Sequence, residues 1–226
     1  SKVEFFFFKF SFSFFIDWAY CKAASLCLSA SLHFFVKSLI LVCEQGFGDS
    51  IQFCRFALLL QNLGIEIILF CQHQLIDLFQ QGSQIKTPTD RINPNTLTRK
   101  PQWIPLLSVP KLLNINHSNI PYKESYITIE KSRIEYWKKQ LKRKKNHLLV
   151  GLHWKGNPQF EISLYSKGRS MQFTEWLGLK NMKGVEFVSL QKGCAQNELR
   201  INEDLKFVQG QEIFNKNYNF IDTAAV

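Results

Sequence analysis

The stretch from Ser38 to Leu63 restricts the fold more than any other part of the chain. It reads SLILVCEQGFGDSIQFCRFALLLQNL: a short apolar run, a turn with two glycines, and a long apolar run. The short run is typical of a buried strand, and the long run is typical of a buried helix. A strand, a glycine turn and a helix in succession predict a parallel α/β sheet, in which ligands bind at the carboxyl ends of the strands.

The turn from Glu44 to Asp49, EQGFGD, differs from the two common phosphate-binding turns. A dinucleotide-binding turn carries a third glycine three residues after the second, and Ile51 occupies that position. A P-loop has a lysine and a hydroxyl residue directly after its last glycine, where this chain has Asp49 and Ser50. The turn therefore favours neither a dinucleotide site nor a P-loop.

Asp49 stands where the turn meets the predicted helix, and two interpretations fit it. As the N-cap, its carboxylate would accept a hydrogen bond from the backbone of Gln52 or a neighbouring residue. As a general base, it would take a proton from an acceptor hydroxyl, because a carboxylate at the carboxyl end of a strand is well placed for that task. Capping aspartates are common, so the residue types alone favour the cap.

The other strand and helix signals alternate along the chain. Apolar runs predict strands at 66–70, 103–107, 126–129, 147–154, 185–190 and 205–208, and helices at 73–81, 131–141, 173–179 and 194–201. Gly64 is placed to end the first helix. Residues 86–101 contain three prolines and predict a surface loop. The alternation favours the α/β class.

Two polar turns of the second half suit an anion. Lys155 and Gly156 follow the predicted strand 147–154, and a lysine beside a glycine turn can hold an anion, although a plain solvent loop is the alternative. Arg169 and Ser170 come just before the amphipathic run 173–179. An arginine beside free backbone N–H groups at a helix N-terminus is a common pyrophosphate site.

The net charge of +10 suggests an anionic partner. The densest charge run is KKQLKRKKNH, residues 138–147. A nucleic-acid site would interleave such a run with stacking aromatic residues, and this run has none, so a solvated helix end between two lobes is favoured over specific nucleic-acid binding. One functional hypothesis is therefore a protein that binds anions or nucleic acid in general through its positive charge.

The six cysteines form no C-x-x-C pair and have no histidine at ligand spacing, which argues against a zinc site. Several lie within apolar runs, as buried reduced thiols do, and predict a cytoplasmic protein. No apolar run is long enough to predict a transmembrane anchor. Residues 1–37, rich in phenylalanine and serine, receive no assignment.

The string EQGFGDSIQFCRF, residues 44–56, resembles the E-Q-G-L-G-D-x-I-Q-F-x-R-Y signature that opens a glycosyltransferase domain found behind tetratricopeptide repeats in many bacterial proteins. That domain is similar to the heptosyltransferases of glycosyltransferase family 9. Further matching motifs follow in the same order: PLLSVP at 105–110, GLHWKGNP at 151–158, GRSM at 168–171, FVSLQKG at 187–193 and FIDTAAV at 220–226. The resemblance covers residues 38–226.

The resemblance implies an α/β fold with two Rossmann-like lobes of the GT-B type. Residues 38–142 would form the acceptor-side lobe, and residues 143–226 an incomplete donor-side lobe, because the family continues with a donor-binding motif beyond the segment matched by FIDTAAV. The expected reaction is inverting sugar transfer from a nucleoside-diphosphate sugar, with no metal and no further cofactor. The acceptor would be a carbohydrate, a lipid-linked molecule or a protein. The alternative is a truncated, noncatalytic α/β binding module.

The resemblance also assigns roles to residues. Asp49 would be the catalytic base, and Arg169, Lys155 and Ser170 would bind the donor phosphates. The residues expected to line the cleft are Glu44, Gln45, Gly46, Gly48, Asn157, Gln191 and Lys192.

Overall fold

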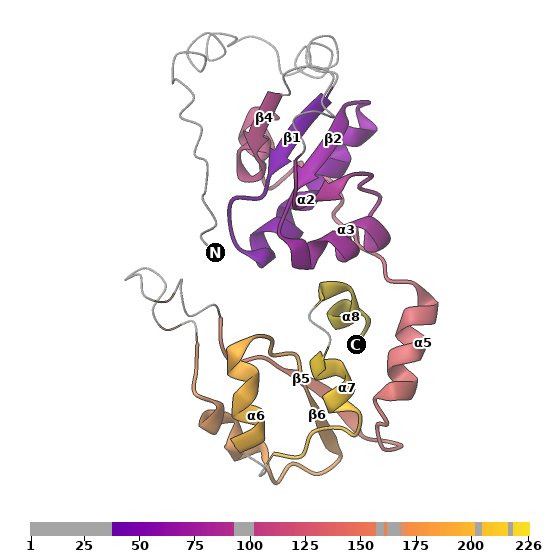
Figure 1. Ribbon diagram of the computed structural model, residues 1–226, viewed down its shortest axis with the longest axis vertical. Helices are drawn as coiled ribbons and strands as arrows, with labels where there is room; N and C mark the ends of the chain where they lie inside the picture. Colours follow the sequence, from indigo (N-terminus) through magenta and orange to yellow (C-terminus); the bar gives the residue numbers. More distant parts are fainter. Residues whose placement is uncertain are drawn as a thin grey trace.

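The computed structural model describes residues 38–92, 102–156, 161, 168, 170–201, 205–216 and 219–226. These residues form two α/β units, with helix α5 (Lys131–Gln140) running along the connection between them (Figure 1). The α/β class with parallel strands is therefore confirmed. None of the described helices is both long enough and apolar enough to cross a membrane.

The first unit contains a four-stranded parallel sheet in the order β3-β2-β1-β4. Its strands are β1 (Ser38–Val42), β2 (Glu66–Phe70), β3 (Pro88–Thr89) and β4 (Gln102–Pro105). The register places Ser38 opposite Glu66 and Val42 opposite Phe70. Because β1 and β2 run parallel, the turns that follow them lie at the same edge of the sheet.

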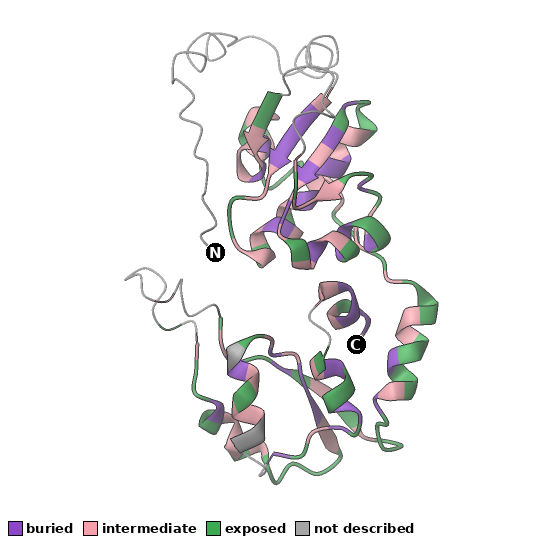
Figure 2. Ribbon diagram, in the orientation of Figure 1, coloured by how far each residue is buried: buried purple, intermediate pink, exposed green. Residues whose placement is uncertain are grey.

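Helix α2 (Phe47–Asn62) follows β1 and packs on this sheet. Its buried residues are Ser50, Cys54, Phe56, Ala57, Leu58 and Leu60, and all of these except Ser50 join buried strand residues in one hydrophobic core (Figure 2). Gly64 has a φ of +84° and its N–H donates to the Gln61 carbonyl, which confirms the predicted end of the helix. A 3₁₀ turn, η2 (His73–Leu75), and α3 (Ile76–Gly82) follow β2.

The chain then passes through β4 into η4 (Leu106–Ser108) and α4 (Val109–Leu112). The second unit pairs β5 (Leu148–Leu152) with β6 (Val185–Ser189) in parallel. Around this pair lie η5 (Phe173–Leu179), η6 (Cys194–Asn197), α6 (Glu198–Ile201) and α7 (Gln211–Lys216). Leu152, Trp154, Phe173, Phe187 and Leu205 form a core there.

Helix α8 (Phe220–Ala225) lies between the two units and packs on both (Figure 1). Ile221 belongs to the core of the first unit, whereas Ala225 packs in a cluster with Trp137 and Phe214 of the second. Trp137 meets Phe214 edge to face, with ring centroids 5.3 Å apart. The helix predicted at 131–141 is confirmed as α5, and Trp137 and Leu141, which follows its last residue, are buried.

Four secondary-structure predictions differ from the structure. Residues 126–129 form no strand, since their apolar alternation reflects packing of Ile127 and Ile129 on the first core. The predicted strand 205–208 is a single bridge from Phe207 to Phe187. Residues 173–179 form a 3₁₀ helix, and residues 88–89 of the predicted loop pair with β2.

Candidate functional site at the carboxyl end of the first sheet

Asp49 lies in the first turn of α2, which follows the carboxyl end of β1 after a turn at residues 43–46. Helix α2 begins at Phe47, so its N-cap is Gly46, and no side chain caps this terminus. The capping interpretation of Asp49 is therefore wrong, because the helix starts three residues earlier than that interpretation requires. The carboxylate is half-buried and makes no hydrogen bond or ion pair with any described residue. The helix dipole stabilises a negative charge at this place.

Neither glycine of the turn is required by the backbone. Gly46 has a φ of −66°, and Gly48 is not among the residues with positive φ. A methyl group on Gly48 would meet no atom within 4 Å, and one on Gly46 would rest 3.4 Å from the Asp49 carboxylate. The missing side chain of Gly46 therefore leaves space beside the Asp49 carboxylate, and Gly48 adds no bulk to the same turn, which suits close approach of a ligand.

Gln72 holds the turn in place from the neighbouring strand. It follows β2, and its amide nitrogen donates to the Gln45 carbonyl at 2.6 Å. Its amide oxygen accepts a hydrogen bond from the buried Ser50 hydroxyl at 3.0 Å. Sequence reasoning missed Gln72, although its position just beyond the second parallel strand could have indicated a place beside the turn.

Glu44 connects the same turn to the opposite neighbour of β1. Its carboxylate accepts a hydrogen bond from the Leu106 N–H at 3.2 Å, where β4 passes into η4. Glu44 and Gln45 are both exposed. The predicted residues of the turn therefore lie together at one edge of the sheet, and Glu44 and Gln72 fix them to β4 and β2.

Three thiols lie beneath the turn, and all are free. Burial raises the pKa of Cys43 to about 11 and the pKa values of Cys54 and Cys71 to about 12. The thiols are therefore protonated at neutral pH and are poor nucleophiles. Within the described residues, no three histidine, cysteine or acidic side chains gather closely enough to bind a metal ion.

In the second unit, the predicted phosphate ligands contact carboxylates. Lys155 forms an ion pair with Glu198, whose other oxygen accepts a hydrogen bond from the Trp154 indole at 3.2 Å. Ser170 accepts a hydrogen bond from the Gly156 N–H at 2.9 Å and donates to Glu161. A diphosphate at this edge would have to displace or rearrange these carboxylates.

Gln191 is only 3% exposed, so it does not line a cleft as predicted. Its amide oxygen accepts hydrogen bonds from the N–H groups of Trp154 and Lys155, at 3.1 and 2.9 Å. Its nitrogen contacts the carbonyls of Lys155 and Lys192, each at 3.0 Å. The side chain therefore ties together the turns after β5 and β6, just as Gln72 does in the first unit.

Lys192 packs with its ammonium 3.6 Å above the centre of the Phe214 ring. Burial lowers the pKa of Lys192 to about 8, although the charge of Asp222 opposes this shift. Arg169 and Asn157 lie outside the described residues. Two hollows of about 390 and 420 Å³ lie elsewhere, and neither is lined by a predicted site residue.

Comparisons of the chain with known protein families, with curated proteins and with solved structures found no match. The assignment of function therefore depends on the geometry of the two units and on the motifs of the sequence. At the first unit this geometry supplies an unpaired carboxylate beside open space. At the second unit it supplies a lysine and a hydroxyl that are held by carboxylates.

Proposed function

We propose that this protein is a glycosyltransferase of the two-lobed GT-B type. In this proposal it moves a sugar from a nucleoside-diphosphate sugar to an acceptor hydroxyl, with inversion at the anomeric carbon. The sequence support comes from the motifs between Glu44 and Val226. They follow one another in the same order as in the domain found behind tetratricopeptide repeats, which they resemble. Residues 38–142 would form the acceptor side and residues 143–226 would belong to the donor side.

The observation that carries the proposal is the environment of Asp49. Its carboxylate is at the carboxyl end of a central parallel strand, where α/β proteins bind their ligands. It has no partner among the described residues, and the missing side chain of Gly46 leaves space beside it. An aspartate whose role was structural would be expected to accept hydrogen bonds from its surroundings.

The proposed reaction begins when Asp49 takes the proton of the acceptor hydroxyl. The oxygen then attacks the anomeric carbon and forms the new glycosidic bond as the bond from that carbon to the phosphate oxygen breaks. The electron pair leaves with the nucleoside diphosphate. Cationic side chains stabilise the charge that develops on this leaving group.

On the donor side, Arg169 is the first candidate for the diphosphate, with Lys155 and Ser170 beside it. Asn157 and Lys192 would contact the nucleotide, and Gln191 would act through the turns that it holds. Two features of the proposed reaction, inversion and catalysis without a metal ion, are inferred from the resemblance alone.

Donor binding can be tested by calorimetric titration with UDP, GDP and ADP and with their sugar conjugates. We expect one of these compounds to bind, and Arg169→Ala to weaken that binding at least ~10-fold, the effect of losing a forked, charge-assisted contact. Arg143→Ala is the matched control, because it removes the same charge from an exposed loop at the opposite edge of the second sheet. Equal weakening in both variants would remove Arg169 from the site.

One observation favours the second candidate function, a noncatalytic α/β binding module. Glu198 forms an ion pair with Lys155, and Glu161 accepts a hydrogen bond from Ser170. In the described part of the donor side, carboxylates therefore already bind the groups that were predicted to bind phosphate. A folded chain that binds none of the nucleotides would support this module over the transferase. Glu198→Gln then provides a further check, because it breaks the ion pair with Lys155. If Lys155 can bind an anion once this carboxylate is removed, the variant should bind diphosphate weakly.

A further inference from the structure

The amino ends of β5 and β6 form a surface that the proposed transfer reaction does not use. The loop between α5 and β5 and the loop before β6 meet there, since the Leu148 N–H donates to the Gly184 carbonyl at 2.8 Å. This edge is opposite the carboxyl ends of the strands, where Lys155 and Lys192 lie. We name it the basic edge. Its residues are Lys142, Arg143, Lys144, Lys145, Leu148, Met182 and Lys183.

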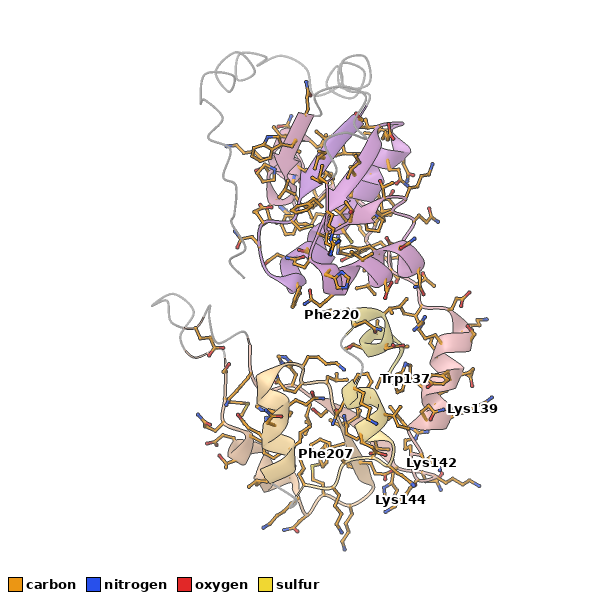
Figure 3. All side chains as sticks on the ribbon, viewed as in Figure 1. Trp137, Lys139, Lys142, Lys144, Phe207 and Phe220 are labelled. Carbon is orange, nitrogen blue, oxygen red and sulfur yellow. The ribbon has the colours of Figure 1, made fainter. Side chains whose placement is uncertain are left out.

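The cationic side chains of the basic edge are all exposed. Lys142, Arg143, Lys144 and Lys145 are consecutive, and Lys183 lies on the adjoining loop. The side chains of these five residues form no ion pair or hydrogen bond with a described residue. Figure 3 shows Lys142 and Lys144 where the chain leaves α5, on the same side of the molecule as Lys139.

The backbone of this loop is fixed, although its side chains are free. The Lys142 N–H donates to the Gln209 carbonyl at 3.0 Å, and the Lys144 N–H donates to the Glu186 carboxylate at 2.6 Å. The Arg143 N–H donates to the Leu141 carbonyl at 2.8 Å. These backbone hydrogen bonds therefore keep the positively charged residues close together. A surface that is already assembled loses little conformational entropy on binding.

Two large aliphatic side chains project from the same edge. Leu148 is 62% exposed and Met182 is 52% exposed. Leu148 is the first residue of β5, and Met182 lies in the loop before β6, so both adjoin the two loops that carry the cations. A cluster of lysine and arginine with exposed aliphatic residues is the composition of surfaces that bind the interface of an anionic bilayer.

The aliphatic residues favour a lipid surface over nucleic acid. Single-stranded nucleic acid is bound by cations together with aromatic side chains on which bases stack. The exposed aromatic residues of the described chain are Trp103 in β4 of the first unit and Tyr136 in α5, and neither belongs to the basic edge. Lipid head groups need only the cations, and the acyl boundary accommodates Leu148 and Met182.

We propose that the basic edge is a peripheral docking surface for a membrane rich in anionic lipids. The cations contact the head groups, and Leu148 and Met182 enter the boundary between head groups and acyl chains. The carboxyl ends of the strands, with the proposed site, then face away from the bilayer surface. The proposal does not depend on sugar transfer, because no residue of the basic edge belongs to the proposed site.

The test is co-sedimentation of the full chain with vesicles of phosphatidylcholine and phosphatidylglycerol in equal parts. One variant replaces Lys142, Arg143, Lys144 and Lys145 with glutamine. The control variant replaces four other exposed lysines with glutamine, namely Lys86, Lys111, Lys123 and Lys131. Both variants lose the same charge, and residues 1–37 are present in each, so any binding by that segment cancels.

We expect the basic-edge variant to lose more than ~100-fold in vesicle partitioning, at about fivefold for each cation removed. The control should lose less than ~10-fold, and Leu148→Ser with Met182→Ser should weaken binding while the charge is kept. Salt should reduce wild-type partitioning. Equal losses in the two charge variants, or binding of a single-stranded oligonucleotide in preference to vesicles, would overturn the proposal.

Discussion

Arg133 donates a hydrogen bond from Nη1 to Oδ1 of Asp222 at 2.7 Å, and this ion pair joins α5 to α8. The same carboxylate oxygen accepts a hydrogen bond from the Trp137 indole at 2.8 Å. Arg133 also donates to the Gln81 side chain of α3 at 3.1 Å. Asp222 is 6% exposed, so one buried carboxylate organises the contact between the two units.

Helix α8 extends this contact to the candidate site. Phe220 packs against Phe47, the first residue of α2, with ring centroids 5.0 Å apart. Asn219 caps α8 by accepting a hydrogen bond from the Asp222 N–H at 2.9 Å. The turn that carries Asp49 is therefore braced by a helix that also packs on the second unit.

We predict that Asp222→Ala lowers the free energy of unfolding by about 2 kcal/mol or more, because it leaves Arg133 and the Trp137 N–H without their buried acceptor. Urea unfolding followed by tryptophan fluorescence measures this. Glu135→Ala is the control, since it breaks an exposed ion pair with Lys138 in the same helix. It should leave stability unchanged, and an equally small effect of Asp222→Ala would show that the network is not a stabilising contact.

The same carboxylate predicts a dependence of stability on acid pH. Burial raises the pKa of Asp222, but hydrogen bonds from Trp137, Arg133 and Asn219 outweigh burial and hold the pKa below its usual value. The folded state therefore gains stability from ionised Asp222 above the unfolded pKa, and this gain is lost as the pH falls through the folded pKa. Wild type and Asp222→Asn should converge in stability in acid. Parallel stability curves would contradict this assignment.

Gly210 provides a prediction about backbone fit. Its φ is +98°, and a methyl group there would overlap the Gln140 carbonyl oxygen. Gly210→Ala should therefore destabilise the chain by about 2 kcal/mol or more. Gly178→Ala is the matched control, because that glycine has open space and no positive φ. The melting temperature should fall only for Gly210→Ala, and equal shifts would refute the clash.

The thiols under the turn should react slowly. Because the pKa of Cys43 is raised from 9.0 to about 11, its thiolate population at neutral pH falls about 100-fold. Alkylation by iodoacetamide, followed by mass spectrometry of the peptide containing Cys43, measures this. The urea-unfolded chain is the reference and should react much faster. Similar rates in the folded and unfolded chain would contradict the buried environment.

The central fold was predictable because its signals are local. The apolar runs of β1, β2 and β6, the long helix α2 and Gly64 each follow from residue type and spacing. The predicted strand at 126–129 was wrong because alternation cannot distinguish strand pairing from packing on helices. Thr128 makes one backbone hydrogen bond, to Gly82, and its apolar neighbours rest on the core.

The candidate site was predictable only in part. The motif placed Asp49, Gly46 and Gly48 together, but the start of α2 at Phe47 depends on geometry that the residue types did not fix. Gln72, Gln191 and Asp222 act through tertiary contacts between distant segments. Amide side chains that bond to the backbone of two turns carry no sequence signature, so Gln191 was expected to line the cleft, whereas it is buried.

The most direct test of the account measures release of nucleoside diphosphate from the sugar nucleotide that binds in the titration, with water as acceptor. Asp49→Asn is compared with Asp77→Asn, which removes a carboxylate from the first turn of α3 and so matches any loss of helix-dipole stabilisation. The account predicts at least a ~100-fold lower rate for Asp49→Asn alone, as loss of a general base gives, with donor affinity retained. Equal rates in the two variants would contradict the account, because Asp49 would then have no role beyond its place in the helix.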